Sequence, residues 1–118
     1  MNDIKRGDIW LVKLDPTLGH EIKKSRPAVI IQNDLGNTYS PITLIAPLTS
    51  QNIESVYPVE VLLTKKDSGL EKDSKVLLNQ IRAIDKKRLI KKIGRVNVEK
   101  LMHIDNAIKI SLGLVDIA

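Results

Sequence analysis

Residues 26–49 read RPAVIIQNDLGNTYSPITLIAPLT, in which two short apolar segments flank a polar one. Residues 27–31 are apolar throughout, and a run this short predicts a strand that is buried on both faces. Residues 42–48 predict a second strand. Residues 33–37 are rich in Asn, Asp and Gly, which tolerate positive φ, and we therefore expect a loop between the two strands.

Short strands continue on both sides of this stretch. We expect strands at residues 9–14, 59–63, 75–78 and 80–84, because β-prone segments alternate there with turn residues. A polar, basic loop, residues 17–25, joins the first strand to the segment that begins at Arg26. Closely spaced short strands without long helices between them favour a small barrel or sandwich over a parallel α/β sheet.

The last third of the chain predicts two helices. Asp85 is suited to cap a short helix that ends at Gly94. Asn97 is the expected N-cap of a second, longer helix. The apolar positions of this helix recur at intervals of three and four and form one stripe: Leu101, Ile104, Ile108, Leu112 and Val115. With no repeat or linker, residues 1–118 are expected to form a single domain that is mainly β with a C-terminal helix.

Composition narrows the possible classes of protein. The 118 residues include no cysteine, which excludes disulfides and thiolate metal sites and suits a reducing cytoplasm. Residues 1–6 are charged, unlike a signal peptide, and no apolar run approaches the ~20 residues that span a bilayer, so we expect a soluble protein without a membrane partner. The net charge is +5, and residues 82–100 hold eight basic residues against two acids. Such a band attracts nucleic acid, although an ordinary solvated surface has the same composition.

Few side chains offer catalytic chemistry. The two histidines, His20 and His103, are too far apart in sequence to form a metal-ligand pair, and no cofactor motif occurs, so we expect neither a metal nor a cofactor. An acidic cluster lies in a lysine-rich turn without a calcium-loop pattern, and we interpret it as surface charge: Asp67, Glu71 and Asp73.

Arg26 and Thr49 remain as candidates. Arg26 directly precedes one predicted strand, and Thr49 lies at the end of the next. Pro27 restricts Arg26 to an extended conformation, which would project the guanidinium from a rigid base. Each residue also has a purely structural explanation. An arginine before a strand often pairs with an acid, and a threonine after one often caps a turn. The residues alone leave both alternatives open.

Around these residues the chain resembles the MazF/PemK family of toxins. The resemblance rests on a series of motifs in one order: RGDIW (6–10), LDPT (14–17), GHE (19–21), RPAVIIQND (26–34), PLTS (47–50), DS (73–74), NQIR (79–82), IDK (84–86) and ISLGL (110–114). It implies a small SH3-like β-barrel of the MazF/PemK/CcdB toxin type that forms a homodimer. It also implies a metal-independent endoribonuclease that cuts single-stranded RNA, such as mRNA, at a short sequence. The implied partner is a cognate antitoxin with an acidic, disordered tail.

The resemblance also assigns roles to residues. Arg26 and Thr49 match the family's catalytic pair. Glu21, Ser50 and Gln80 match positions that line the RNA groove or order the loop over it. RNA carries its own nucleophile, the 2′-hydroxyl, so a metal is optional, and an arginine suits the charge that develops on the phosphate.

Two positions depart from the plasmid-borne branch of the family, which has an aspartate where this chain has Asn79 and an arginine where it has Leu77. Because Asn79 cannot carry a proton, His20 becomes the nearby side chain that titrates close to neutral pH, and general acid or base help would fall to it. Asn79 and Gln80 are suited to read the edges of unpaired bases, and Lys24 is expected to contact the RNA.

A rival function on the same fold is non-enzymatic poisoning of gyrase, which depends on extreme C-terminal residues that include a tryptophan. Residues 115–118 of this chain are VDIA, and its single tryptophan is Trp10. The tail that this alternative requires is therefore missing.

Overall fold

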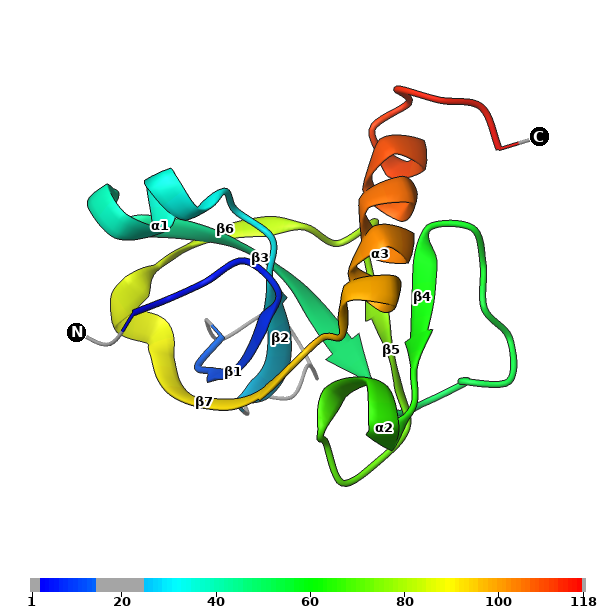
Figure 1. The fold of residues 1–118 in the computed structure, drawn as a ribbon, viewed down its shortest axis with the longest axis horizontal. Coiled ribbons are helices and arrows are strands. Elements are labelled where there is room, and N and C mark those ends of the chain that lie inside the picture. The colour runs from blue at the N-terminus through cyan, green and yellow to red at the C-terminus, as the bar shows by residue number, and fades with distance from the viewer. Residues whose placement is uncertain (1–2, 15–24, 118) are drawn as a thin grey trace, which may run out of the picture.

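The structure, a computed structural model, describes residues 3–14 and 25–117. Within these ranges the chain forms seven strands, which are β1 (Asp8–Val12), β2 (Arg26–Ile30), β3 (Ile42–Thr49), β4 (Glu60–Leu63), β5 (Ser74–Leu77), β6 (Arg82–Asp85) and β7 (Leu89–Arg95). The described helices are α1 (Asp34–Tyr39), α2 (Lys65–Ser68) and α3 (Val98–Ser111), and a 3₁₀ turn covers Lys86–Arg88. Figure 1 shows α3 crossing the molecule beside β4 and β5.

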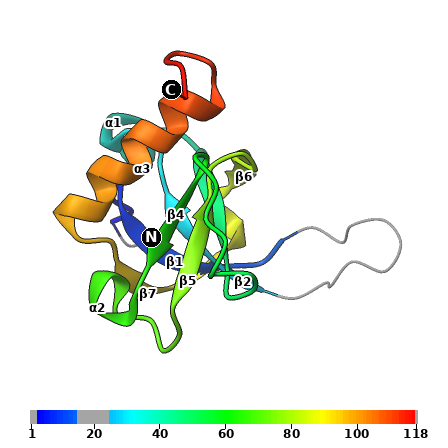
Figure 2. The same ribbon diagram turned by 90° about the vertical axis from the view of Figure 1, so that its right-hand side faces the viewer.

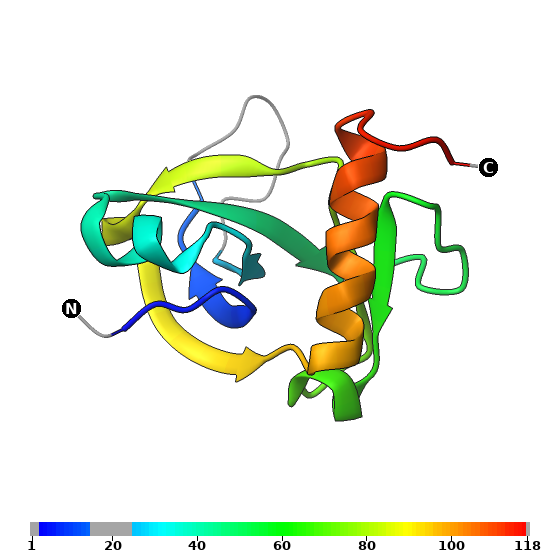
Figure 3. The same cartoon turned by 45° about the horizontal axis from the view of Figure 1, so that its top comes forward.

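β3 is the central strand and pairs with three others. Residues 42–45 pair with β6, residues 45–47 pair with β2, and Leu48 and Thr49 pair with β5. The strands follow the order β4-β5-β3-β2-β1-β7, with β6 beside β3, and these pairs are all antiparallel. Figure 3 shows β7 curling round from the end of β6 to the start of α3. The expectation of a mainly β chain with a C-terminal helix is confirmed.

The apolar core has two parts. One lies between α3 and strands β3, β4 and β5, where Leu48, Leu63 and Ile104 are buried. Figure 2 shows α3 above β4 and β5 from the side. The other part surrounds Trp10 and includes residues of β1, β2, β3, β6 and β7. Both parts are built almost entirely from aliphatic side chains, so the fold depends on many small contacts.

Residues 33–37 are not the predicted loop, because α1 begins at Asp34. The Asn33 side chain accepts a hydrogen bond from the Gly36 N–H at 2.8 Å and so caps the helix. Asn37 is buried, and its Oδ1 accepts a 2.7 Å hydrogen bond from the Thr43 hydroxyl of β3. Residues that favour turns thus act here as the cap and the anchor of a short helix, which composition alone does not distinguish.

Residues 85–94 are not the predicted helix either. Asp85 does cap a turn, since its Oδ1 accepts from the Lys87 N–H at 2.8 Å, but the turn ends at Arg88 and β7 follows. The register between β7 and β1 shifts twice, and residues 90–92 are exposed in succession. The two-residue alternation of a strand is therefore lost, and the apolar spacing resembles that of a helix. Pairing with β1 outweighs this local pattern.

Gly94 lies inside β7 instead of ending a helix. A Cβ atom built on Gly94 would lie 2.3 Å from the backbone oxygen of Ser68, the last residue of α2. Real Cβ atoms essentially never approach another atom so closely. Glycine at this position therefore allows α2 to end directly against β7.

α3 begins where the sequence predicts. The Asn97 Oδ1 accepts a hydrogen bond from the Lys100 N–H at 2.8 Å, which is the expected N-cap, and Ile104 of the predicted stripe is fully buried. The helix ends at Ser111, so the last two predicted positions lie beyond it: Leu112 and Val115. No helix of the described residues is long and apolar enough to cross a membrane.

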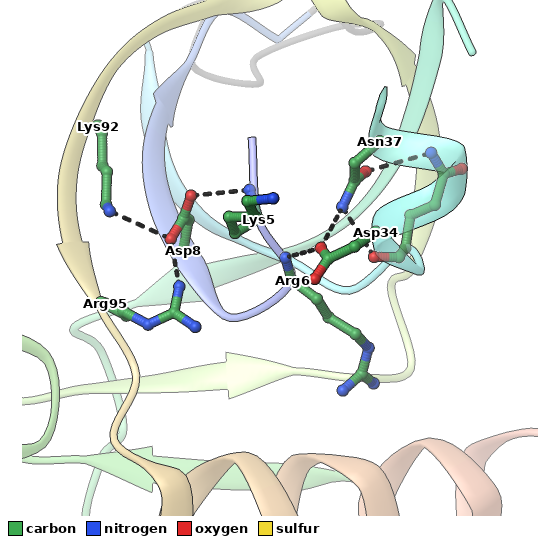
Figure 4. Close-up of polar contacts among 8 residues, drawn as sticks. Lys5, Arg6, Asp8, Asp34, Asn37, Lys92 and Arg95 are labelled. Carbon is green, nitrogen blue, oxygen red and sulfur yellow. Dashed lines mark hydrogen bonds and ion pairs between the residues drawn. The ribbon is translucent and has the colours of Figure 1, made fainter. Parts of the chain in front are cut away.

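A buried aspartate joins β1 to β7 (Figure 4). The Asp8 side chain is 0% exposed, and its Oδ1 lies 2.6 Å from Arg95 Nη1 and 3.3 Å from Lys92 Nζ. Its Oδ2 accepts a hydrogen bond from the Lys5 N–H at 2.9 Å. A buried charge is costly unless it is paired, and two cations pair with this one. Lys92 and Arg95, part of the basic band at residues 82–100, therefore have a structural role.

Candidate active site

A hollow of about 630 Å³ opens where β2 begins and β3 ends. The antiparallel register places Ala28 opposite Pro47, and continuing it by two residues brings Arg26 and Thr49 to the same edge of the sheet. The hollow is bordered by the start of β2, the end of β3, the turn from α2 to β5, and β7: Ser25, Arg26, Pro27, Leu48, Thr49, Ser50, Gln51, Gly69, Leu70, Glu71, Lys72, Ser74 and Ile93.

Arg26 is half-buried, and its guanidinium forms no hydrogen bond or ion pair with any other residue that the structure describes. The Arg26 backbone lies opposite Val12 of β1, and Pro27 follows Arg26 in β2. The strand therefore fixes the base of the side chain while its five N–H donors remain available. Pairing with an acid, the structural explanation for this arginine, is absent from the described part of the chain.

Thr49 is the last residue of β3 and is half-buried. Its hydroxyl oxygen accepts a hydrogen bond from the Gln51 N–H at 3.2 Å, so the turn-capping explanation holds for this threonine. The cap uses a lone pair of the oxygen and leaves the O–H free to donate. Thr49 can therefore close its turn and still donate a hydrogen bond into the hollow, beside the exposed Ser50.

The turn from α2 to β5 forms a further wall of the hollow, and its part in the site was not predicted. It supplies an acidic, a basic and an apolar side chain to the lining, which are Glu71, Lys72 and Leu70. Within the described chain, no hydrogen bond or ion pair engages the Glu71 carboxylate, so this acceptor is available to a ligand. The hollow thus combines apolar side chains with donors and an acceptor, as small-molecule and base sites commonly do.

Two acids of the predicted cluster, Asp67 in α2 and Asp73 in the turn that follows, are hydrogen-bonded within the protein, which corrects the interpretation of the cluster as surface charge. The Asp67 Oδ2 accepts from the Thr64 N–H at 2.8 Å, and its Oδ1 accepts from Asn97 Nδ2 at 2.9 Å. The Asn97 N–H also donates to the Asp67 carbonyl at 3.0 Å. Asp73 Oδ1 accepts from the Lys65 N–H at 2.9 Å. These contacts hold the wall to β4 and to the start of α3.

The pKa of Asp67 lies below its ordinary value. The main cause is the hydrogen bond from the Thr64 N–H, partly opposed by burial, and the Thr64 hydroxyl and Asn97 lower the pKa further. Asp67 is therefore ionised at neutral pH, and each of its hydrogen bonds is charge-assisted. Thr64 and Asp67 have the spacing of a capping box, which is a local signal in the sequence, but Asn97 lies thirty residues further along the chain and its connection to Asp67 is hidden.

Asn79 and Gln80 do not line the hollow. They are exposed in a turn after β5, where the Gln80 N–H donates to the Leu77 carbonyl at 3.1 Å, and Ser74 at the opposite end of β5 lines the hollow. His20, Glu21 and Lys24 lie outside the described residues, so their predicted roles remain predictions. Among the residues that are described, no three His, Cys, Asp or Glu side chains form a group that could hold a metal ion.

The sequence matches one family over most of its length. The model of the PemK-like, MazF-like toxins of type II toxin–antitoxin systems covers residues 5–112. This chain belongs to that family. The Arg26–Thr49 edge and the hollow beside it lie within the matched residues, as does the whole of α3.

Solved structures of PemK/MazF toxins have the same fold. A MazF structure from Deinococcus radiodurans has 23% sequence identity and a TM-score of 0.78, with 96% of this chain and 99% of that chain covered. An endoribonuclease in complex with its cognate antitoxin, from a mycobacterial species, has 22% identity and a TM-score of 0.78, with 96% and 98% covered. A MazE–MazF structure from Deinococcus radiodurans has 22% identity and a TM-score of 0.78, with 98% and 100% covered. The resemblance seen in the sequence motifs is confirmed.

Proposed function

We propose that this toxin is a sequence-specific endoribonuclease that cleaves single-stranded RNA without a metal in the cytoplasm and is neutralised by a cognate antitoxin. The observation that carries the proposal is that Arg26, whose guanidinium has no other described partner, and Thr49 line the same hollow at one edge of the sheet. Similar structures described as an endoribonuclease with its antitoxin and as MazE–MazF support both the activity and the partner.

The reaction begins with the RNA's own 2′-hydroxyl. Its oxygen attacks the neighbouring phosphorus as the bond from phosphorus to the 5′-oxygen breaks, which leaves a 2′,3′-cyclic phosphate and a 5′-hydroxyl. The proton lost by the 2′-hydroxyl is balanced by the proton gained by the leaving oxygen. Negative charge grows on the two non-bridging oxygens, and Arg26 can donate to both while Thr49 donates alongside it. DNA lacks the nucleophile and is not a substrate.

Bases next to the cut can enter the hollow. Pro27, Leu48, Leu70 and Ile93 provide apolar contacts for a base face, and Glu71 can accept from an amino group on a base edge. His20, Glu21, Lys24, Asn79 and Gln80 remain proposed RNA contacts outside the lining of the hollow.

The direct test is digestion of a long single-stranded RNA by the purified toxin in excess EDTA. We expect cleavage to persist at a recurring short sequence, because the proposed chemistry needs only the 2′-hydroxyl and protein side chains. The fragments should carry a 2′,3′-cyclic phosphate and a 5′-hydroxyl. A DNA of the same sequence is the control and should stay intact. Cleavage that stops with the chelator, or equal cleavage of the DNA, would refute the proposal.

We also propose that residues 1–118 act as one domain and form a homodimer. The outer face of α3 exposes apolar side chains, among them Val98 and Met102, and Leu112 just beyond the helix is exposed as well. Covering them with a second copy would contribute ~25 cal/mol for each Å² of apolar surface. Analytical ultracentrifugation at micromolar concentration should give twice the chain mass of 13.2 kDa. A single species at the monomer mass would contradict the dimer.

A further inference from the structure

Lys75 is a buried lysine on β5. It is 4% exposed, although lysine is almost never fully buried unless it is paired. Its Nζ donates to the Ser55 carbonyl at 2.8 Å and lies 2.9 Å from Glu60 Oε1. The ammonium also lies 5.8 Å from the centre of the Tyr57 ring, within the range of a cation–π interaction. These contacts connect β5 to residues far from it in sequence.

Glu60 completes the arrangement at the start of β4. Its Oε1 also accepts a hydrogen bond from the Tyr57 N–H at 3.0 Å, and its side chain is 10% exposed. Burial raises the pKa of Glu60, but the Tyr57 N–H and the Lys75 ammonium together outweigh burial and hold the pKa below its ordinary value. Glu60 is therefore ionised at neutral pH.

The strand register places this pair on the same face of the sheet as Thr49. Lys75 lies directly opposite Thr49 on β3 and opposite Leu62 on β4, and side chains that lie opposite each other share a face. Glu60 is two residues before Leu62 and is on that face too. The alternate residues of β5 and β4, Val76 and Leu63, are fully buried in the core on the other face.

Residues 50–59 connect β3 to β4 and have few other attachments. Figure 2 shows this segment beside β4 and β5. Eight of its ten residues are exposed and only Ile53 and Val59 are half-buried, so little apolar burial holds it down. Its Ser55 N–H bonds locally, to the Asn52 carbonyl at 3.2 Å. Tyr57 is also bonded to Glu60 of β4, through its own N–H and through its carbonyl, whereas Ser55 is held to the sheet by the hydrogen bond from Lys75.

We infer that Lys75, paired with Glu60, is a positioning residue for RNA cleavage: it anchors residues 50–59 to the sheet and so fixes Thr49, Ser50 and Gln51 at the hollow. The inference rests on the proposed function. Residues 50–59 begin immediately after Thr49, and the hydrogen bond from the Gln51 N–H to the Thr49 hydroxyl depends on their course. If the anchor is lost, the Thr49 hydroxyl and the rim of the hollow lose their fixed geometry, which lowers kcat more than it changes KM.

The test compares Lys75→Met, Lys75→Arg and Lys66→Met. Methionine keeps much of the length of the side chain without its charge, arginine keeps a cation that can donate to Glu60, and Lys66 is an exposed lysine of α2 that provides the control. In Lys75→Met we expect the Ser55 and Tyr57 amides to exchange with solvent about tenfold faster, because the segment loses one charge-assisted hydrogen bond. We expect kcat for RNA cleavage to fall about tenfold with KM nearly unchanged.

Lys75→Arg should restore most of the wild-type amide protection and most of the wild-type kcat. Lys66→Met should match the wild type in both. Glu60→Gln provides a second variant with a smaller disturbance, because Lys75 keeps its bond to Ser55. As in Lys75→Met, amide exchange should become faster and kcat should fall. Unchanged exchange in Lys75→Met and Glu60→Gln, or faster exchange with unchanged kcat, would overturn the inference while the wild type still cuts RNA. A wild type that leaves RNA intact would refute the proposed function, whatever the exchange rates show.

Discussion

Arg26→Ala is expected to lower kcat for RNA cleavage by ~10²–10³-fold while the protein remains folded. The guanidinium is the group at the hollow able to donate two parallel hydrogen bonds to the non-bridging phosphate oxygens, where charge grows in the transition state. Because no other described residue bonds to it, its removal leaves no described partner unsatisfied. The free energy of unfolding should change by less than about 0.5 kcal/mol. Single-turnover cleavage and urea unfolding measure the two effects.

Two further variants identify the source of the loss. Arg26→Lys keeps the charge without the planar fork and should recover only part of the rate. Lys91→Ala removes an exposed cation of β7 that does not line the hollow, and it should leave kcat close to that of the wild type. If Arg26→Ala cuts RNA at the wild-type rate, catalysis lies elsewhere. If Lys91→Ala loses as much activity as Arg26→Ala, general charge and not the position of Arg26 is responsible.

Gly94→Ala is expected to destabilise the protein by about 3 kcal/mol. Its new Cβ would lie 2.3 Å from the Ser68 carbonyl oxygen. The position of a Cβ is fixed by its own backbone and the oxygen belongs to the backbone of Ser68, so neither atom can rotate away. Relief requires α2 to move off β7, and the wall of the hollow that follows α2 would move with it. The midpoint of thermal unfolding should fall by roughly 10–15 °C. Scanning calorimetry of the variant and the wild type measures the difference.

The matched control is Gly113→Ala. Gly113 has a φ of +73° after α3, and a Cβ on it would meet no atom within 4 Å. This variant bears only the cost of a left-handed conformation for alanine, about 1 kcal/mol. The difference between the two variants measures the contact with α2. Equal losses of stability in both would mean that the close approach of Gly94 to Ser68 is unimportant.

Several elements were predictable because their signals are local. Residues 27–31 and 42–48 are short apolar runs, and each matches a strand to within a residue or two. Asn97 caps α3 through its own side chain, as its place before an apolar stripe predicts. Arg26 and Thr49 meet because neighbouring antiparallel strands bring the start of one to the end of the next.

Other elements were unpredictable because distant partners decide them. Residues 89–95 form a strand only because β1 is available to pair with them. The wall of the hollow depends on the bond between Asp67 and Asn97, thirty residues apart, and on the contact between Gly94 and Ser68. The role of Lys75 depends on Glu60 and Ser55 in the same way. No periodicity or motif within a short window contains such pairings.

Asn97 belongs to two structures at once. Its side-chain oxygen caps α3, while its side-chain and backbone N–H groups both bond to Asp67 in α2. Fraying of the first turn of α3 therefore breaks the bonds that hold the hollow's wall, and release of the wall uncaps the helix. The two regions are expected to open as one cooperative unit, with a single local unfolding free energy, although α3 lines no part of the hollow. A ligand that stiffens the hollow would then slow amide exchange at the start of α3, some distance from anything it touches.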